Sequence, residues 1–251
     1  MIRRTLSALG LGLGLRLRVG LGLLLITAGI PHVAAANEPE CVVLLHGLLR
    51  VSNSMGELET KLQRAGYRAV NINYPSRSNT IDELAVDAVG RGLDACREAG
   101  APVINFVTHS LGGILLRYYE QHIGIPELGR VVMLGPPNHG SELVDGLKPV
   151  PGFELLTGPT GSALGTGETS ILNDLGPVHF DLGVIAGTTN INPLNLIFMH
   201  ESNDSIVSVA STKVEGMRAH LVLPVTHTLM MRNNTVIDNT IHYLKTGAFI
   251  P

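Results

Sequence analysis

Residues 108–113 read Thr-His-Ser-Leu-Gly-Gly and contain the clearest candidate for a catalytic group. The apolar run 102–107 precedes them, and apolar side chains at helical spacing follow them (Ile114, Leu115, Tyr118 and Tyr119). A serine in a sharp turn between a strand and a helix has the arrangement of a nucleophile elbow. Such a turn lifts the hydroxyl clear of the sheet, within reach of a histidine base and a helix N-terminus. Ser110 is therefore the candidate nucleophile.

One position of this segment departs from the usual pattern. Thr108 stands where glycine is usual, so the strict G-x-S-x-G motif is not met. The turn needs small residues two positions before and two positions after the serine, because their side chains face each other across the bend. Gly112 meets the second requirement, and a threonine is tolerable at the first if the turn opens slightly. The alternative is that Ser110 is the N-cap of an ordinary helix.

A serine nucleophile needs a histidine base and a carboxylate that orients the base. In a parallel sheet the loops that follow the strands share one edge, so both partners should come just after a strand. His227 follows the last expected strand and precedes the terminal helix. Asp204 follows the penultimate strand in a polar turn, with Glu201 as the nearest alternative. We expect Asp204 to orient His227, and His227 to act on Ser110.

The developing oxyanion requires backbone N–H donors. One should come from Leu111, directly after the serine. The other should come from the turn after the first strand, where His46, Gly47 and Leu48 follow one another. We expect the N–H groups of Leu48 and Leu111 to form the oxyanion hole.

Short apolar runs and helical spacings alternate along the chain after residue 36. Runs of this kind are typical of strands buried on both faces of a parallel sheet. We expect strands at 41–45, 67–74, 103–107, 130–134, 182–186 and 219–225. Helical spacing predicts helices at 54–65, 80–99, 114–122 and 236–245. This order predicts an α/β fold: a mostly parallel sheet of about six strands with helices on both faces.

Residues 136–176 are rich in Gly, Pro, Ser and Thr and show little periodicity. Long irregular segments often carry function. We expect a lid-like loop excursion over one end of the sheet, with no large cap domain. A passive loop is the alternative.

Four segments together are similar to the α/β-hydrolase superfamily, and most similar to its small bacterial esterases and lipases. They are residues 43–48 (VLLHGL), 108–113 (THSLGG), 203–209 (NDSIVSV) and 225–228 (VTHT), in the family's order. Residues 135–141 (GPPNHGS) also resemble a loop near the acyl pocket of such lipases. The resemblance covers essentially the whole chain after residue 36. Ser205 stands where glycine often follows the acid.

The resemblance implies acyl-enzyme hydrolysis with Ser110, Asp204 and His227 as the triad and Leu48 and Leu111 as oxyanion donors. We expect cleavage of carboxylic esters, either small molecules or lipids, with no organic cofactor and no metal. The scarcity of amphipathic helix in the excursion favours small or medium acyl esters over triglycerides. Two alternatives stay open: an acyltransferase with the same triad, and a non-catalytic binding protein of the same fold.

Composition limits the other classes of function. The 251 residues carry a net charge of −3 with no basic stripe beyond the N-terminal segment. Binding to nucleic acid is therefore not expected. The length predicts one domain, residues 37–251. Neither composition nor motif indicates an oligomeric state.

Residues 1–36 have the pattern of a secretory signal peptide. The segment contains a basic n-region, an apolar h-region at 19–30 and a small-residue cleavage site at 34–36. The apolar run is shorter than the roughly 20 residues that span a bilayer. We expect cleavage, export to the periplasm or the medium, and no stable membrane insertion afterwards. An uncleaved anchor in the inner membrane is the alternative.

The chain has two cysteines, Cys41 and Cys96. In an oxidising compartment they are a candidate disulfide. Such a bond would close a loop of roughly 55 residues. Two buried free thiols are the alternative.

Overall fold

The computed structural model describes residues 39–167 and 171–251. The signal-peptide prediction for residues 1–36 lies outside these residues. Six parallel strands form one sheet in the order β2-β1-β3-β4-β5-β6. The strands are β1 (Cys41–Leu45), β2 (Arg68–Ile72), β3 (Ile104–His109), β4 (Leu128–Leu134), β5 (Leu182–Gly187) and β6 (Ala219–Leu223).

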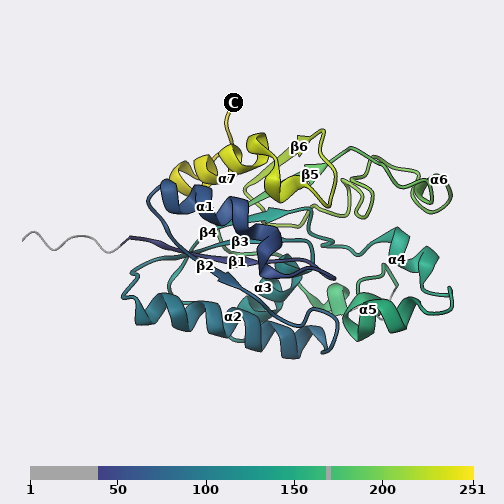
Figure 1. Ribbon diagram of the computed structural model, residues 1–251, viewed down its shortest axis with the longest axis horizontal. Coiled ribbons are helices and arrows are strands. Elements are labelled where there is room, and N and C mark those ends of the chain that lie inside the picture. Colours follow the sequence, from purple (N-terminus) through teal and green to yellow (C-terminus); the bar gives the residue numbers. More distant parts are fainter. Residues whose placement is uncertain (1–38, 168–170) are drawn as a thin grey trace, which may run out of the picture. The chain divides into compact units, whose positions relative to one another are not determined.

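Helices cover both faces of the sheet (Figure 1). One layer contains α1 (Gly56–Arg64) and α7 (Asn234–Thr246), and the opposite layer contains α2 (Ile81–Glu98) and α3 (Leu111–His122). Shorter elements are α4 (Glu142–Leu147), α5 (Phe153–Ser162), α6 (Asn195–Phe198) and the 3₁₀ turns Ser52–Met55, Ile171–Asp174 and Met230–Arg232. Within the described ranges, no helix is both long and apolar enough to cross a membrane.

Strand β1 shows how the sheet serves two cores. Val43 and Leu45 pack with the side chains of α2 and α3, whereas Val42 and Leu44 pack with those of α1 and α7. All four side chains are fully buried. Successive side chains of a strand point to opposite faces, so a strand between two helical layers is apolar at every position. Each such side chain contributes about 1.5–3 kcal/mol of burial free energy.

The predicted elements are confirmed to within a few residues at each end. The largest shift is in α3, which was predicted to begin at Ile114 and begins at Leu111, directly after Ser110. The two glycines at its start show no hydrophobic periodicity, which explains the late predicted start. The early start places the N-terminus of α3 next to the candidate nucleophile.

The segment 136–176 is more helical than its composition predicts. It contains α4 and α5, and α5 has a kink at Gly158 with φ 69° and ψ −174°, just before Pro159. The expectation of an irregular loop is wrong in this respect. The helices are short and α5 changes direction at the kink, so its apolar side chains do not repeat at one helical spacing.

Arg117 of α3 holds this excursion to the rest of the domain. Its side chain is buried, and its guanidinium donates to the carbonyls of Asn138, Leu175 and Gly176 and to the Asn138 side chain. Burial lowers the pKa of Arg117 to about 10. Because one side chain bonds both ends of the segment, the excursion starts and finishes at a fixed place.

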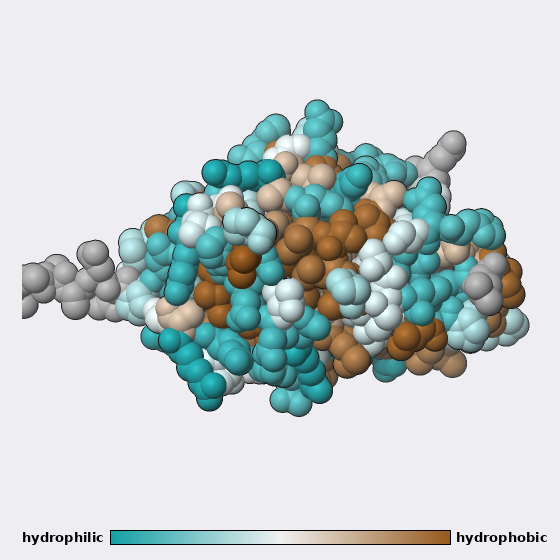
Figure 2. All heavy atoms as spheres, turned by 90° about the horizontal axis from the view of Figure 1, so that it is seen from above, coloured by the Kyte–Doolittle hydropathy of each residue, from teal (hydrophilic) through white to brown (hydrophobic). Residues whose placement is uncertain are grey.

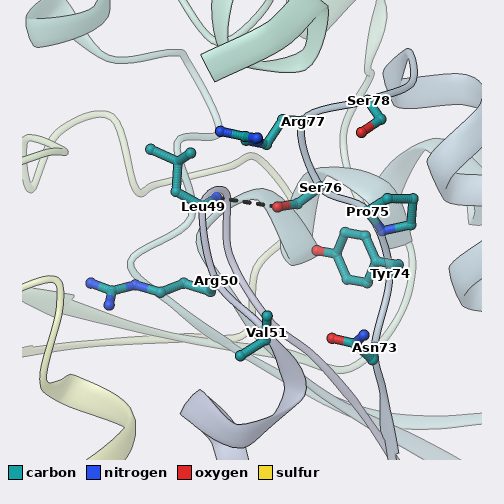
Figure 3. Close-up of a pocket in the computed structure, with 9 residues that line it drawn as sticks. All are labelled: Leu49, Arg50, Val51, Asn73, Tyr74, Pro75, Ser76, Arg77 and Ser78. Carbon is teal, nitrogen blue, oxygen red and sulfur yellow. Dashed lines mark hydrogen bonds between the residues drawn. The ribbon is translucent and has the colours of Figure 1, made fainter. Parts of the chain in front are cut away.

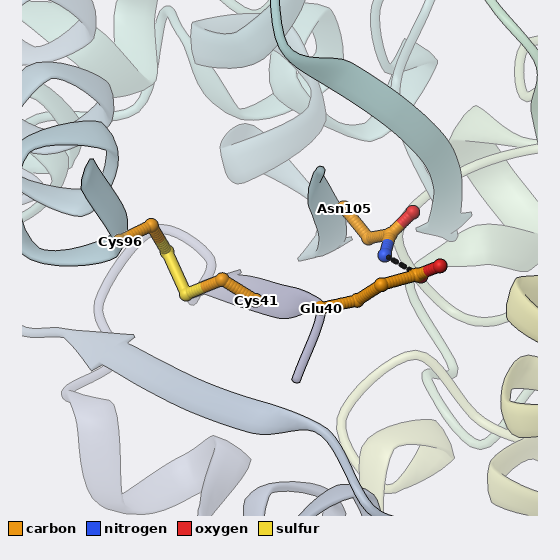
Figure 4. Close-up of a disulfide and its surroundings, with 4 residues drawn as sticks. All are labelled: Glu40, Cys41, Cys96 and Asn105. Carbon is orange, nitrogen blue, oxygen red and sulfur yellow. Dashed lines mark hydrogen bonds between the residues drawn. A yellow bond between two sulfur atoms is a disulfide. The ribbon is translucent and has the colours of Figure 1, made fainter. Parts of the chain in front are cut away.

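A disulfide joins Cys41, at the start of β1, to Cys96, near the end of α2 (Figure 4). The Cα atoms lie 5.8 Å apart and both residues are fully buried. Beside it, Asn105 of β3 donates to the Glu40 carboxylate at 2.8 Å. The bond joins the first strand to the helix that covers it, at the amino-terminal ends of the strands, opposite to the candidate site.

Replacing both cysteines by alanine is expected to lower the free energy of unfolding by about 2–4 kcal/mol, because the unfolded chain loses a closed loop. Urea unfolding of the oxidised wild type and of C41A/C96A measures the difference. Wild type unfolded under a reducing agent is the matched control and should fall to the level of the variant. A difference below about 0.5 kcal/mol would contradict the stabilising role.

Candidate active site

Ser110 occupies the sharp turn between β3 and α3. Its backbone has φ 53° and ψ −121°, a conformation that residues other than glycine rarely adopt. The Ser110 N–H donates to the Leu134 carbonyl at 2.9 Å, and its own carbonyl accepts from the Gly113 N–H at 3.0 Å. Such a backbone costs about 1–3 kcal/mol and persists only when its surroundings impose it. Here neighbouring strands and the helix start impose it.

The turn is tight because α3 crosses close to the loop after β1. A Cβ on Gly112 would lie 2.6 Å from the Leu45 carbonyl oxygen. No side chain fits at that distance, so glycine at this position lets the helix approach the strand. The requirement for a small residue two positions after the serine is therefore explained by β1.

Thr108 fits the turn through a different neighbour. Its side chain is fully buried, and a Cβ on Gly113 would lie 3.3 Å from the Thr108 Oγ1. The second glycine of the Gly112–Gly113 pair therefore leaves the space that the threonine fills. The Thr108 hydroxyl has no hydrogen-bond partner among the described residues.

Thr108→Val is expected to raise the free energy of unfolding by about 1 kcal/mol, because it replaces an unpaired buried hydroxyl with a methyl group of the same shape. This corresponds to a rise in Tm of about 2–4 °C for a domain of this size. Differential scanning calorimetry measures the shift. Thr108→Ser, which keeps the hydroxyl and removes the methyl group, is the control and should lower Tm. A fall in Tm for the valine variant would indicate that the hydroxyl is paired.

His227 and Asp204 form a buried pair after β6 and β5. The His227 Nδ1 lies 2.7 Å from the Asp204 Oδ2, and the His227 N–H donates to the Asp204 carbonyl at 2.9 Å. The other carboxylate oxygen accepts from the N–H groups of Ile206 at 3.1 Å and Val207 at 2.8 Å. Both carboxylate oxygens are thus fixed, and the imidazole turns its Nε2 away from the acid. This arrangement suits a base whose tautomer must be held.

The backbone around the pair is closely fitted. Gly135, after β4, has φ 55°, and a Cβ there would lie 3.0 Å from the Asp204 Oδ2 and 3.1 Å from the His227 Nδ1. Any side chain would press on the pair, so glycine is required at this position.

Ser205 has φ 95°, in the left-handed region. Its N–H donates to the Asn203 side chain at 3.0 Å, and its hydroxyl accepts from the Ile191 N–H at 2.8 Å. Asn195 in turn donates to the same Asn203 oxygen at 2.9 Å. These bonds hold Ser205 in a strained conformation that glycine would adopt more easily, and they keep the loop that carries Asp204 in place.

The loop after β1 presents the predicted oxyanion donor. Among the described residues, neither the Leu48 N–H nor the Leu111 N–H has a hydrogen-bond acceptor. The next residue, Leu49, has φ 58°, and its N–H donates to the Ser76 hydroxyl at 3.1 Å. Two unpaired N–H groups, one in the loop after β1 and one at the start of α3, are what an oxyanion hole requires.

Two residues that sequence reasoning missed hold this loop. The Tyr74 hydroxyl donates to the His46 carbonyl, and the Tyr74 ring stacks on the His46 ring with centroids 4.1 Å apart. Ser76 bonds Leu49 as described above. Burial lowers the pKa of His46, which favours the neutral ring. No sequence signal links residues 74–76 to the turn at 46–49, because only the parallel pairing of β1 and β2 brings them together.

His109 contacts the backbone of His227. It is buried, and its Nε2 lies 2.9 Å from the His227 carbonyl oxygen. The acceptor is a carbonyl, so Nε2 carries the proton and donates. Burial, reinforced by the nearby His227, holds the pKa of His109 well below its usual value. A neutral His109 therefore fixes the backbone of His227.

Ser110 and His227 line one cavity of about 480 Å³. This is within the usual size of small-molecule sites. Its apolar wall comes mainly from the excursion: Leu143, Val144, Leu147, Phe153, Leu156 and Leu164. Leu48 and Leu49 also line it. The cavity thus places an apolar ligand against the candidate nucleophile.

Apolar side chains are also exposed at the end of the molecule that carries α4, α5 and α6, among hydrophilic ones (Figure 2). They are Val150, Leu155, Leu156, Ile191, Leu194 and Ile197. Leu156 both lines the cavity and is exposed, so the rim of the cavity is partly apolar. Within residues 39–167 and 171–251, no group of three or more His, Cys, Asp or Glu side chains could hold a metal ion.

Comparison with solved structures identifies the fold. The mature form of the lipase BlEst2 from Bacillus licheniformis matches with a TM-score of 0.63 and 17% identity, over 85% of this chain and 94% of that one. Phospholipase PlaB from Legionella pneumophila matches with a TM-score of 0.61 and 19% identity, over 82% of this chain and 57% of that one. The Pyrococcus furiosus esterase Pf2001 matches with a TM-score of 0.57 and 14% identity, over 83% of both chains.

No protein-family profile matches the chain, and no curated protein sequence matches it. The likeness to these solved structures shows that the chain has the α/β-hydrolase fold. The fold predicted from the four segments is thereby confirmed.

Proposed function

We propose that this protein is a serine hydrolase that cleaves carboxylic esters through an acyl-enzyme on Ser110. The observation that carries the proposal is the convergence of three parts on one cavity. A strained Ser110 and the histidine of a buried His227–Asp204 pair line it, and the unpaired N–H groups of Leu48 and Leu111 lie after β1 and at the start of α3. The solved lipases and esterases of this fold support the reaction class.

The geometry supports the following sequence of steps. Ser110 Oγ attacks the ester carbonyl carbon while His227 Nε2 takes the hydroxyl proton, and the carbonyl oxygen becomes an oxyanion beside the Leu48 and Leu111 N–H groups. The tetrahedral intermediate collapses, the ester C–O bond breaks, and His227 returns the proton to the leaving alkoxide. Water repeats the cycle: its proton goes to His227, its oxygen bonds the acyl carbon, and Ser110 regains its proton as the acid leaves.

A fluorophosphonate probe tests the nucleophile directly. Peptide mass spectrometry of the labelled native protein should place the phosphonyl group on the peptide that contains Ser110. Heat-denatured protein is the control and should remain unlabelled, because the labelling depends on the folded site. A label on another serine, or none, would contradict the proposal.

The substrate should carry a small or medium acyl chain. The cavity is closed on one side by α4 and α5, which are held to the domain by Arg117 at the ends of the excursion. A panel of p-nitrophenyl esters of rising chain length measures the preference as kcat/KM. Equal or rising rates up to the longest insoluble esters would contradict it. Adding an alcohol acceptor to the same assay distinguishes hydrolysis from acyl transfer.

We also propose that the protein is exported. The basic, apolar and small-residue pattern of residues 1–36 and the buried Cys41–Cys96 bond support this. The N-terminus of protein recovered from a cell fraction outside the cytoplasm should follow the small-residue site at 34–36. An intact N-terminus there would support the anchored alternative.

A further inference from the structure

A second hollow adjoins the cavity at the loop after β1 (Figure 3). We call it the arginine pocket; it has a volume of about 450 Å³ and is lined by Leu49, Arg50, Val51 and residues 73–78. Leu49 and Arg50 line both the arginine pocket and the cavity that contains Ser110. The two spaces therefore adjoin at these two residues.

The charges around this junction are all of one sign. Arg50 and Arg77 line the arginine pocket, and no Asp or Glu lines it or the cavity. Arg50 has no ion pair and no hydrogen bond among the described residues. Five of the six ion pairs of the described residues involve an arginine elsewhere on the surface. Arg50 therefore offers an unpaired guanidinium in the lining of the cavity that also contains Ser110.

The second arginine is held in place. Its guanidinium donates to the Leu156 carbonyl of α5 at 3.2 Å, and Thr160 donates to the Asn79 carbonyl at 2.5 Å. A Cβ on Gly158 would clash with the Arg77 carbonyl at 1.8 Å, so α5 and this loop are in direct contact. In Figure 3 the Arg50 and Arg77 side chains both extend to the side on which the Leu49 side chain lies. The Arg77 guanidinium is therefore preorganised, whereas the Arg50 guanidinium is free to bind a ligand.

We propose that the ester cleaved at Ser110 carries an anionic group, phosphate or carboxylate, that binds Arg50 and Arg77 in the arginine pocket. This rests on the proposed function. The apolar chain of the ester would lie along the excursion wall of the cavity, and the anion would lie past Leu49. Guanidinium groups bind phosphate and carboxylate through charge-assisted hydrogen bonds, and the absence of acids from both linings leaves these donors to a ligand.

Matched substrates test the preference. The decanoate esters of glycerol, glycerol 3-phosphate, glyceric acid and glycerophosphocholine share one chain and differ in charge. We expect kcat/KM to be about tenfold higher for the phosphate or the carboxylate ester than for the neutral ester. The zwitterionic ester should resemble the neutral one. The two anionic arms distinguish phosphate from carboxylate recognition, and the advantage should shrink at high salt.

Variants connect the preference to the pocket. Arg50→Gln and Arg77→Gln should each lower the ratio of anionic to neutral kcat/KM to about one to three, with both esters measured on the same variant. Arg68→Gln is the matched control: Arg68 is exposed at the start of β2, at the end of that strand away from residues 73–78, and its variant should keep the wild-type ratio.

Equal rates on charged and neutral esters in the wild type would overturn this inference while leaving the proposed function intact. Failure to hydrolyse any ester, together with no fluorophosphonate label, would overturn the proposed function itself. A preference that survives in both arginine variants would place the anion site elsewhere and would also overturn the inference.

Discussion

Ser110→Ala is expected to lower kcat for p-nitrophenyl ester hydrolysis by at least about 10⁴-fold, because no other group can form the acyl-enzyme. The fold should be retained. Alanine removes only the hydroxyl, and the Ser110 hydrogen bonds in the turn are made by its backbone N–H and carbonyl. Kinetics at saturating ester, with Tm and circular dichroism as checks on the fold, measure the effect.

Ser141 is the comparison for this variant. It lines the same cavity, but its hydroxyl donates to the Ile206 carbonyl at 2.5 Å instead of facing a base. Ser141→Ala should therefore change kcat by no more than about tenfold, the effect of one hydrogen bond. A large loss in Ser141→Ala with little change in Ser110→Ala would mean that the wrong serine has been assigned.

Three backbone positions show where the fold stores strain. Among the described residues, Leu49, Ser110 and Ser205 are the ones other than glycine with positive φ. They lie in the loop after β1, in the turn between β3 and α3 and in the loop that carries Asp204, respectively. Each costs about 1–3 kcal/mol, and the hydrogen bonds that their N–H groups donate to Ser76, Leu134 and Asn203 hold them. The positive φ values of residues other than glycine thus lie in three segments around one cavity, and strained backbone clusters in this way at functional sites.

The parts of the site that could be predicted from sequence depend on local pattern and strand order. Ser110 lies in a recognisable turn, and Asp204 and His227 lie just after strands whose carboxyl ends must meet at one edge. That rule brings distant residues together without any knowledge of side-chain contacts. The Asp204 and His227 side chains are in contact, as this rule predicts.

The remaining features depend on long-range packing that leaves no local pattern. Tyr74 and Ser76 form hydrogen bonds with the loop after β1 only because β1 and β2 are neighbours. His109 reaches the His227 carbonyl across more than one hundred residues of chain. The helices of the excursion were missed because both are short and the kink at Gly158 interrupts the periodicity of α5. Such contacts become visible only when the elements are assembled.

Asp204→Asn is expected to lower kcat by about 10⁴-fold while the fold is preserved. The asparagine carbonyl can still accept from the Ile206 and Val207 N–H groups, and the backbone bond from His227 to residue 204 does not involve the side chain. The amide NH₂ then faces the His227 Nδ1 as a donor. The imidazole then keeps its proton on Nε2, and in this tautomer Nε2 cannot accept the Ser110 proton. Any imidazolium that does form during attack also lacks the buried negative charge of Asp204.

Three measurements identify this cause. Glu201→Gln is the matched control: Glu201 is the alternative acid by sequence, its side chain is exposed, and its variant should keep kcat within a few-fold, as expected for a surface substitution. Fluorophosphonate labelling of Asp204→Asn should slow in parallel with kcat, because both need the same base. The double variant Ser110→Ala/Asp204→Asn should be no slower than Ser110→Ala, since residues that act as one unit are not additive. A loss below about tenfold in Asp204→Asn would mean that another group orients the base, and a further loss in the double variant would mean that the two residues act separately.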